Sequence, residues 1–186
     1  PGSPIEVPAE VIDGFFDLYV PAIQAAVAAD PEATRQLLSV TRAPVDAADP
    51  ATIEETILGL AWYVVFATND ATLKLGGQPF GNMFRMYSGS NDNAALNRDV
   101  ARFSPDFAAL GTIQRQYQTT GRLARPLVTL HTTGDPIIPY WHESIYTLKT
   151  LLTGSFARHI NIPIARYGHC NFKSSEVLAG FAVLLF

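Results

Sequence analysis

The sequence predicts an α/β protein in which a mostly helical segment precedes a βαβα unit. Up to about residue 124, apolar side chains recur at helical spacing between Pro, Gly and Asn breaks. From residue 125 onward, short β-rich runs alternate with amphipathic helical stretches. This order favours parallel strands that are covered by helices. We therefore divide the chain into a helical segment, residues 1–124, and a C-terminal βαβα unit, residues 125–186.

Three long helices are expected first. PAEVIDGFFDLYVPAIQAAVAAD, residues 8–30, has apolar residues at helical spacing, with a kink expected at Pro21. DPEATRQLLSV (30–40) and DPATIEETILGLAWYVVFATND (49–70) each open with Asp as N-cap and Pro at the first helical position. The run from Ile57 to Ala67 is too short to span a bilayer, and we expect a buried helix.

Shorter elements follow. GGQPFGNMFRMYSGSN, residues 76–91, is expected to be a loop, either one pinned to the core by its aromatic residues or a functional loop over a pocket. Two short helices are expected within residues 92–121. The βαβα unit then comprises a strand in RPLVTLHT, a turn in TGDPIIP, a helix in YWHESIYTLKTLLTG, a strand in ARHINIPIA and a helix in KSSEVLAGFAVLLF.

Composition limits the function. The formal net charge of -4 gives no clustered basic surface for nucleic acid or an anionic membrane, so small or neutral substrates fit better. The single cysteine, Cys170, excludes an intrachain disulfide. It is expected to be a small apolar residue packed under the histidine turn, and the alternative is a reactive thiol beside His169. The four histidines show no HExxH or i, i+4 pairing, which argues against a metal site. No cofactor is implied.

Asp135 and His169 are the candidate catalytic residues. Each follows one of the two predicted strands, and parallel strands present their carboxyl ends at one edge of a sheet, so the two side chains are expected to meet. A carboxylate that accepts a hydrogen bond from one ring nitrogen leaves the other free to take a proton from a nucleophile. Asp135 would orient, and His169 would be the general base. The structural alternative is that both belong only to turns.

RPLVTLHTTGDPIIP and RYGHCNFKSSE resemble the C-terminal end of an α/β-hydrolase. The resemblance covers residues 125–186, and it implies that Asp135 is the triad acid and His169 the triad histidine. The form GHCxFxxxE, with Phe172 and Glu176, is similar to a subset of esterase-like hydrolases. The resemblance also implies that residues 9–120 are a helical cap and that the fold is a partial α/β-hydrolase.

The nucleophile of such an enzyme is missing from the sequence. No GxSxG elbow occurs, and Ser88 and Ser90 have no preceding strand. We therefore expect the C-terminal fragment of a serine hydrolase for carboxylic esters or amides, inactive alone, with its serine in a missing N-terminal part. The expected partner is a second copy or a complementing N-terminal chain.

Two alternatives stay open. One is a non-catalytic helical binding or dimerisation module with a degenerate hydrolase tail, which predicts that Asp135 and His169 do not approach within hydrogen-bond distance. The other is a complete small enzyme in which Ser88 or Ser90 reaches His169 across a dimer.

Overall fold

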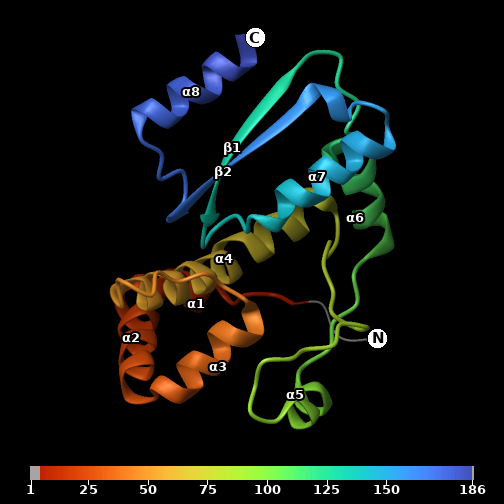
Figure 1. Cartoon of the computed structure of the whole chain (residues 1–186). Coiled ribbons are helices and arrows are strands. Elements are labelled where there is room, and N and C mark those ends of the chain that lie inside the picture. Colours follow the sequence, from red (N-terminus) through yellow and green to blue (C-terminus); the bar gives the residue numbers. More distant parts are fainter. Residues whose placement is uncertain (1–4, 186) are drawn as a thin grey trace. The chain divides into compact units, whose positions relative to one another are not determined.

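The computed structural model describes residues 5–185, which form two compact units (Figure 1). Unit 1 comprises residues 5–43 and 57–118, and unit 2 comprises residues 44–56 and 119–185. The described residues contain eight α-helices and one parallel sheet of two strands. The α/β class is thereby confirmed, whereas the division at residues 124 and 125 stays a prediction.

Most of the helices lie in unit 1. The predicted first helix, residues 8–30, is divided into three pieces, because Pro21 lacks the amide hydrogen of a regular turn and the chain widens into a π-helical turn just before it. The helical elements before the sheet are α1 (Ala9–Asp13), the π-helix η1 (Phe15–Tyr19), α2 (Val20–Ala29), α3 (Pro31–Thr41), α4 (Ala51–Leu75), α5 (Asn93–Asp99), α6 (Phe107–Thr112) and the π-helix η2 (Ile113–Tyr117).

Aspartate caps begin α3 and α4 as predicted. The Asp30 carboxylate accepts a hydrogen bond of 2.9 Å from the Ala33 amide, and the Asp49 carboxylate accepts one of 3.1 Å from the Ala51 amide. Each cap satisfies an amide that has no partner inside its helix. These short polar signals therefore locate the start of α3 at Pro31 and the start of α4 to within one residue, since α4 begins at Ala51 and not at Pro50.

The core of unit 1 lies where helix α4 meets the N-terminal helices. Phe15 is buried and packs edge to face on Phe66, with ring centroids 5.2 Å apart. The expectation that the whole run from Ile57 to Ala67 is buried is wrong, since Val64 is 59% exposed. An amphipathic helix buries one stripe only. No helix within residues 5–185 is long and apolar enough to cross a membrane.

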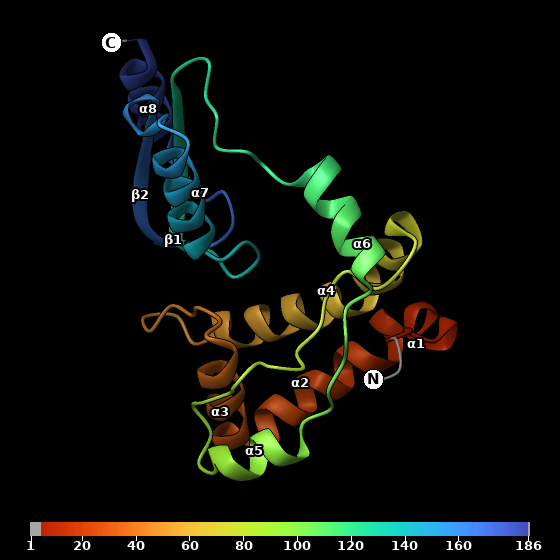
Figure 2. The same cartoon turned by 90° about the vertical axis from the view of Figure 1, so that its right-hand side faces the viewer.

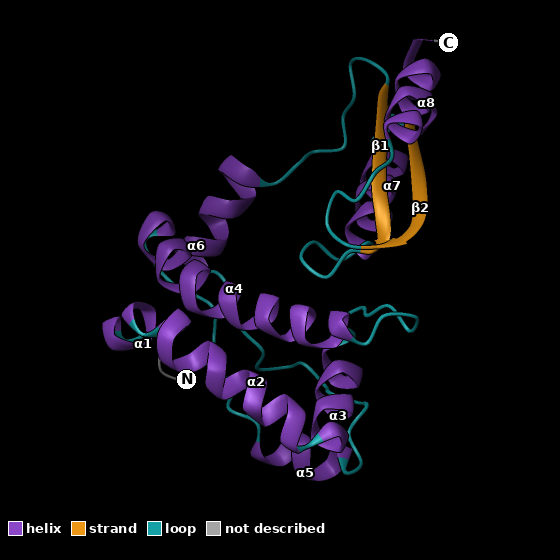
Figure 3. Ribbon diagram, turned by 90° about the vertical axis from the view of Figure 1, so that its left-hand side faces the viewer, coloured by secondary structure: helices purple, strands orange, loops and turns teal. Residues whose placement is uncertain are grey.

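Unit 2 contains the sheet. Strands β1 (Leu127–Gly134) and β2 (His159–Tyr167) pair in parallel, and helices α7 (Trp141–Leu152) and α8 (Ser174–Leu185) lie beside them (Figures 2 and 3). A short 3₁₀ turn, η3 (Phe156–Arg158), leads into β2. The order β1, α7, β2, α8 is the βαβα unit that the sequence predicts.

The two helices cover opposite faces of the sheet. Thr129 of β1 bonds to Glu143 of α7, whereas its neighbour Leu130 packs on Gly180 of α8. Adjacent residues of a strand point to opposite faces, so α7 covers the Thr129 face and α8 covers the Leu130 face.

The pairing shifts at the carboxyl ends of both strands. Thr132 pairs with Ile164 but Gly134 pairs with Tyr167, which leaves one extra residue on β2. A Cβ at Gly134 would lie only 3.0 Å from the Tyr167 Cα, so glycine permits this close approach. Such bulges redirect the chain at functional edges. A turn follows each strand. The turn after β1 carries Asp135, and the turn after β2 carries His169.

Candidate active site

Asp135 lies in the turn that follows β1. Its Oδ1 accepts hydrogen bonds of 2.8 Å from the amides of both Ile137 and Ile138, and the residue is only 2% exposed. An aspartate that bonds to amides two and three residues later is a common way to close a turn. The local sequence thus fixes the carboxylate in place and leaves its second oxygen available.

His169 lies in the turn that follows β2. Gly168 precedes it with φ of +104°, in the region that favours glycine. The Gly168 amide donates to the Gly134 carbonyl at 3.1 Å, and the Gly168 carbonyl accepts from the Thr132 hydroxyl at 2.6 Å. Both bonds tie this turn to β1. They place His169 beside the Asp135 turn, with 43% of its side chain exposed.

The two candidate residues meet. His169 Nδ1 lies 2.8 Å from Asp135 Oδ2, so the ring donates this proton to the carboxylate. Burial acts to raise the pKa of Asp135, but hydrogen bonds from the Ile138 amide, the His169 ring and the Ile137 amide outweigh it, and the pKa lies below its ordinary value. The pair is therefore an ionised acid and an oriented imidazole.

This geometry suits general base catalysis. A proton on Nδ1 leaves the Nε2 lone pair of neutral His169 to accept a proton, and the nearby carboxylate stabilises the imidazolium that results. A hydroxyl or thiol at Nε2 would become a better nucleophile. The site can thus activate a nucleophile and later return the proton to a leaving group.

A salt bridge closes the base of the histidine turn. Arg166, near the end of β2, donates to both carboxylate oxygens of Glu176 on α8, at 2.9 and 2.7 Å, and also to the Asn171 carbonyl at 2.6 Å. Glu176 additionally accepts from the Lys173 amide at 2.7 Å, as a glutamate in the first turn of a helix often does. Residues before, within and after the turn are thereby joined. Glu176 therefore has a structural role at the base of the histidine turn.

Replacing Glu176 with Gln is expected to loosen the histidine turn. Hydrogen bonds from Arg166 and then Lys173 lower the pKa of Glu176 to about 2 from 4.5. A lowered pKa contributes stability above pH 4.5 that is lost as the pH falls through about 2. The stability difference between wild type and Glu176→Gln should therefore be constant above pH 4.5 and shrink toward pH 2, with faster amide exchange in the turn above pH 4.5. Chemical denaturation with hydrogen exchange measures both. A difference that grows on acidification contradicts the assignment.

Ser88 and Ser90 lie in unit 1, in the loop before α5. The Ser90 hydroxyl donates to the Asn93 side chain at 3.0 Å, as a polar group near a helix start often does. In residues 5–185 the strands are β1 and β2, and both follow these serines. Neither serine therefore sits on a strand-to-helix elbow.

The expectation that Cys170 is buried is wrong. Cys170 is exposed, has φ of +50°, and places its Sγ 3.5 Å from His169 Nε2. The left-handed conformation turns the side chain out of the turn instead of under it. A thiol thus lies next to the nitrogen that would accept the nucleophile proton. The exposed position agrees with the alternative of a thiol beside His169, although no spacing rule signals a positive φ at a non-glycine residue.

The remaining histidines take other positions. His142 stacks on Trp141 with ring centroids 3.9 Å apart, and His159 is buried at the start of β2. His131 lies on β1 beside the Asp135 turn, where its Nε2 is 3.4 Å from Asp135 Oδ2. Within residues 5–185, no group of three or more His, Cys, Asp or Glu side chains is arranged to hold a metal ion.

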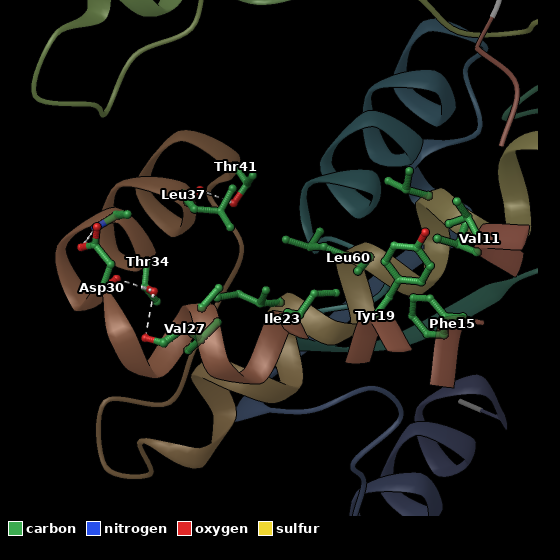
Figure 4. A pocket seen from close by; sticks show the side chains of 16 residues that line it. Val11, Phe15, Tyr19, Ile23, Val27, Asp30, Thr34, Leu37, Thr41 and Leu60 are labelled. Carbon is green, nitrogen blue, oxygen red and sulfur yellow. Dashed lines mark hydrogen bonds between the residues drawn. The ribbon is translucent and has the colours of Figure 1, made fainter. Parts of the chain in front are cut away.

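Unit 1 contains an apolar cavity of about 760 Å³ (Figure 4). Val27 of α2, Leu37 of α3 and Leu60 of α4 are among its lining residues. The polar groups at its end are paired, since the Thr34 hydroxyl donates to the Asp30 carbonyl at 2.9 Å. The lining is mostly apolar, and Tyr19, Asp30, Thr34 and Thr41 are its polar members.

The chain matches no protein-family model, no curated protein and no solved structure. The geometry of the Asp135 and His169 pair is therefore the basis for a functional proposal.

Proposed function

We propose that this chain supplies the acid and the base of a serine hydrolase that acts on carboxylic esters, with amides as the second substrate class. The fold that goes with this function is a partial α/β-hydrolase, in which unit 2 is the C-terminal part of the core and the helices before residue 120 form a cap. Water is the co-substrate, and no cofactor is required.

One observation carries the proposal. The 2.8 Å bond between His169 Nδ1 and Asp135 Oδ2 joins two turns at the carboxyl ends of paired parallel strands. These are the positions in which an α/β-hydrolase holds its acid and histidine. The binding-module hypothesis predicts that these side chains stay apart, so the short distance favours the hydrolase.

The reaction follows the order of proton transfers in a Ser-His-Asp triad. His169 Nε2 takes the serine proton as the oxygen attacks the ester carbonyl, and Asp135 stabilises the imidazolium. The imidazolium then gives that proton to the leaving alkoxide, which departs as the alcohol and leaves an acyl-enzyme. Water, deprotonated by His169, attacks the acyl group, and the returned proton restores the serine and releases the acid.

The serine is proposed to come from outside these 186 residues, since the sequence contains no GxSxG elbow. A complementing N-terminal polypeptide would bring it to His169, and either that polypeptide or a second copy of the chain would cover the edges of the sheet. The sheet has only two strands in the described residues, and edges of this kind accept further strands.

The test is labelling with a fluorophosphonate, which reacts with activated serines. The probe is applied to the native protein that contains this chain, together with any polypeptide that co-purifies with it. We expect a labelled serine outside residues 1–186, and we expect labelling to disappear in His169→Gln. A His142→Gln variant is the control and should label normally. Labelling of Ser88 or Ser90, or labelling that survives His169→Gln, contradicts the proposal.

A second candidate has Cys170 as the nucleophile of a thiol hydrolase. The observation that favours it is the 3.5 Å distance from Cys170 Sγ to His169 Nε2, which completes a chain of thiol, imidazole and carboxylate. Hydrolysis of p-nitrophenyl acetate by the isolated chain separates the two candidates. The serine proposal expects Cys170→Ala to leave the background rate unchanged, whereas the thiol candidate expects the burst of nitrophenol to disappear.

A further inference from the structure

The sheet face under helix α7 is polar where it approaches the Asp135 turn. Thr129 of β1, Asn161 of β2 and Glu143 of α7 meet there, and the register pairs Thr129 directly with Asn161. A helix usually packs on a sheet through apolar side chains. The proposed triad does not include any of these residues, so the cluster needs a separate explanation.

Glu143 receives several hydrogen bonds in this cluster. Its Oε2 accepts from the Thr129 hydroxyl at 2.8 Å and from the Asn161 amide at 3.0 Å. The Asn161 orientation is fixed by the Tyr140 hydroxyl, which donates to its Oδ1 at 2.6 Å. Only 16% of the Glu143 side chain is exposed, so a partner of opposite charge would stabilise it further.

Each ring nitrogen of His131 lies near a hydrogen-bond acceptor. Its Nδ1 lies 3.3 Å from Glu143 Oε1, while its Nε2 lies 2.9 Å from the Ile138 carbonyl and 3.4 Å from Asp135 Oδ2. A carbonyl cannot donate, and an ionised carboxylate cannot either. Each ring nitrogen must then carry a proton if both contacts are hydrogen bonds. A ring with two protons is a cation.

We propose that His131 is a doubly protonated positioning residue that links Glu143 to Asp135 and holds the Asp135 turn for His169. The inference rests on the proposed function for its purpose, although the charge state can be measured without it. Glu143, His131, Asp135 and His169 then form a row of four side chains in contact, which we call the charged row. The charge alternates from Glu143 to His131 to Asp135, and His169 is the member that gains and loses a proton.

The two backbone groups of Ile138 explain how His131 would act on the turn. The Ile138 amide donates to Asp135 Oδ1 at 2.8 Å, and the Ile138 carbonyl accepts from His131 Nε2 at 2.9 Å. His131 thereby holds the residue whose amide orients the acid. Loss of this bond would let the Asp135 carboxylate rotate away from His169 without removing either triad member.

The experiment is nitrogen-15 NMR of the histidine rings in the whole chain, with Glu143→Gln as the test variant. In the wild type we expect both His131 nitrogens to be protonated while Asp135 and Glu143 are ionised. The glutamine can donate to Nδ1 from its amide, so the neutral His131 ring keeps its place with a proton on Nε2 alone. We also expect the His169 Nδ1 proton to exchange about tenfold faster, since a charge-assisted contact in the row is lost.

Glu176→Gln is the matched control. This variant removes a carboxylate next to the histidine turn, but it leaves Glu143 and Asp135, the two carboxylates near His131, unchanged. The His131 ring should therefore stay doubly protonated. A His131 ring with one proton in the wild type overturns the inference, whether or not ester hydrolysis is found. A doubly protonated ring in Glu143→Gln also overturns it. If His131 behaves as expected but no activated serine is found, the charged row stands and the serine hydrolase proposal falls.

Discussion

Replacing Asp135 with Asn is expected to lower kcat of the proposed hydrolase about 10⁴-fold. Asparagine matches aspartate in shape and still accepts the Ile137 and Ile138 amides through Oδ1, so the turn should persist. Its NH₂ group now faces His169 Nδ1 and donates to it. The neutral ring then carries its proton on Nε2, the position that must accept the nucleophile proton. The base is present in the wrong tautomer, which explains the size of the effect.

The measurement is steady-state hydrolysis of p-nitrophenyl esters, with circular dichroism to verify that the variant folds. Asp106→Asn is the matched control, because Asp106 also accepts two amide bonds, at the start of α6, but does not contact a histidine in the described structure. It should retain wild-type kcat. A loss of less than about tenfold in Asp135→Asn would mean that the carboxylate does not set the tautomer of the base.

Replacing Gly121 with Ala is expected to destabilise unit 2 by about 3 kcal/mol. Gly121 has φ of +76°, and an added Cβ would lie 2.5 Å from the carbonyl carbon of Lys149 on α7. Left-handed strain costs about 1 kcal/mol and a clash with backbone costs about 2 kcal/mol. The Gly121 carbonyl also accepts from the Thr153 hydroxyl at 2.8 Å, so a displaced chain loses that bond as well.

Gly154→Ala is the matched control for strain without a clash. Gly154 has φ of +72°, but nothing lies within 4 Å of its added Cβ, so about 1 kcal/mol is expected. Urea denaturation followed by Trp141 fluorescence in a Trp62→Phe background reports on α7 alone. If Gly121→Ala and Gly154→Ala lower the free energy of unfolding equally, Gly121 does not lie against the Lys149 backbone.

Capping residues and the spacing of apolar side chains predicted most of the helices and strands. Asp30 and Asp49 mark helix starts that depend on contacts within a few residues, which is why sequence alone locates them. The π-helical turn η1 could not be predicted, because it arises where the chain before Pro21 packs on its neighbours. In unit 2, Pro44–Thr56 joins the sheet through the Tyr167 hydroxyl, which lies 2.9 Å from Thr56 Oγ1, and burial raises the pKa of Tyr167. No local pattern signals so distant a contact.

The candidate site was predictable in its two principal members. Asp135 and His169 follow strands of a βαβα unit, and topology alone places such residues at one edge. The polar row was missed, although a signal for it existed. Thr129 and His131 alternate on β1, and His159 and Asn161 alternate on β2, so polar side chains occupy one face of a strand that a helix should cover. Polar side chains at these alternate positions therefore predict a polar cluster between the sheet and the helix that covers it.

The most direct test of the central claim is the tautomer of His169 in the whole chain, measured by nitrogen-15 NMR at a pH where the ring is neutral. An imidazole held by Asp135 should carry its proton on Nδ1 and leave Nε2 bare. That result means that the base is oriented before any nucleophile arrives. A ring with its proton on Nε2, or one that averages between the two forms as free imidazole does, contradicts an assembled acid and base.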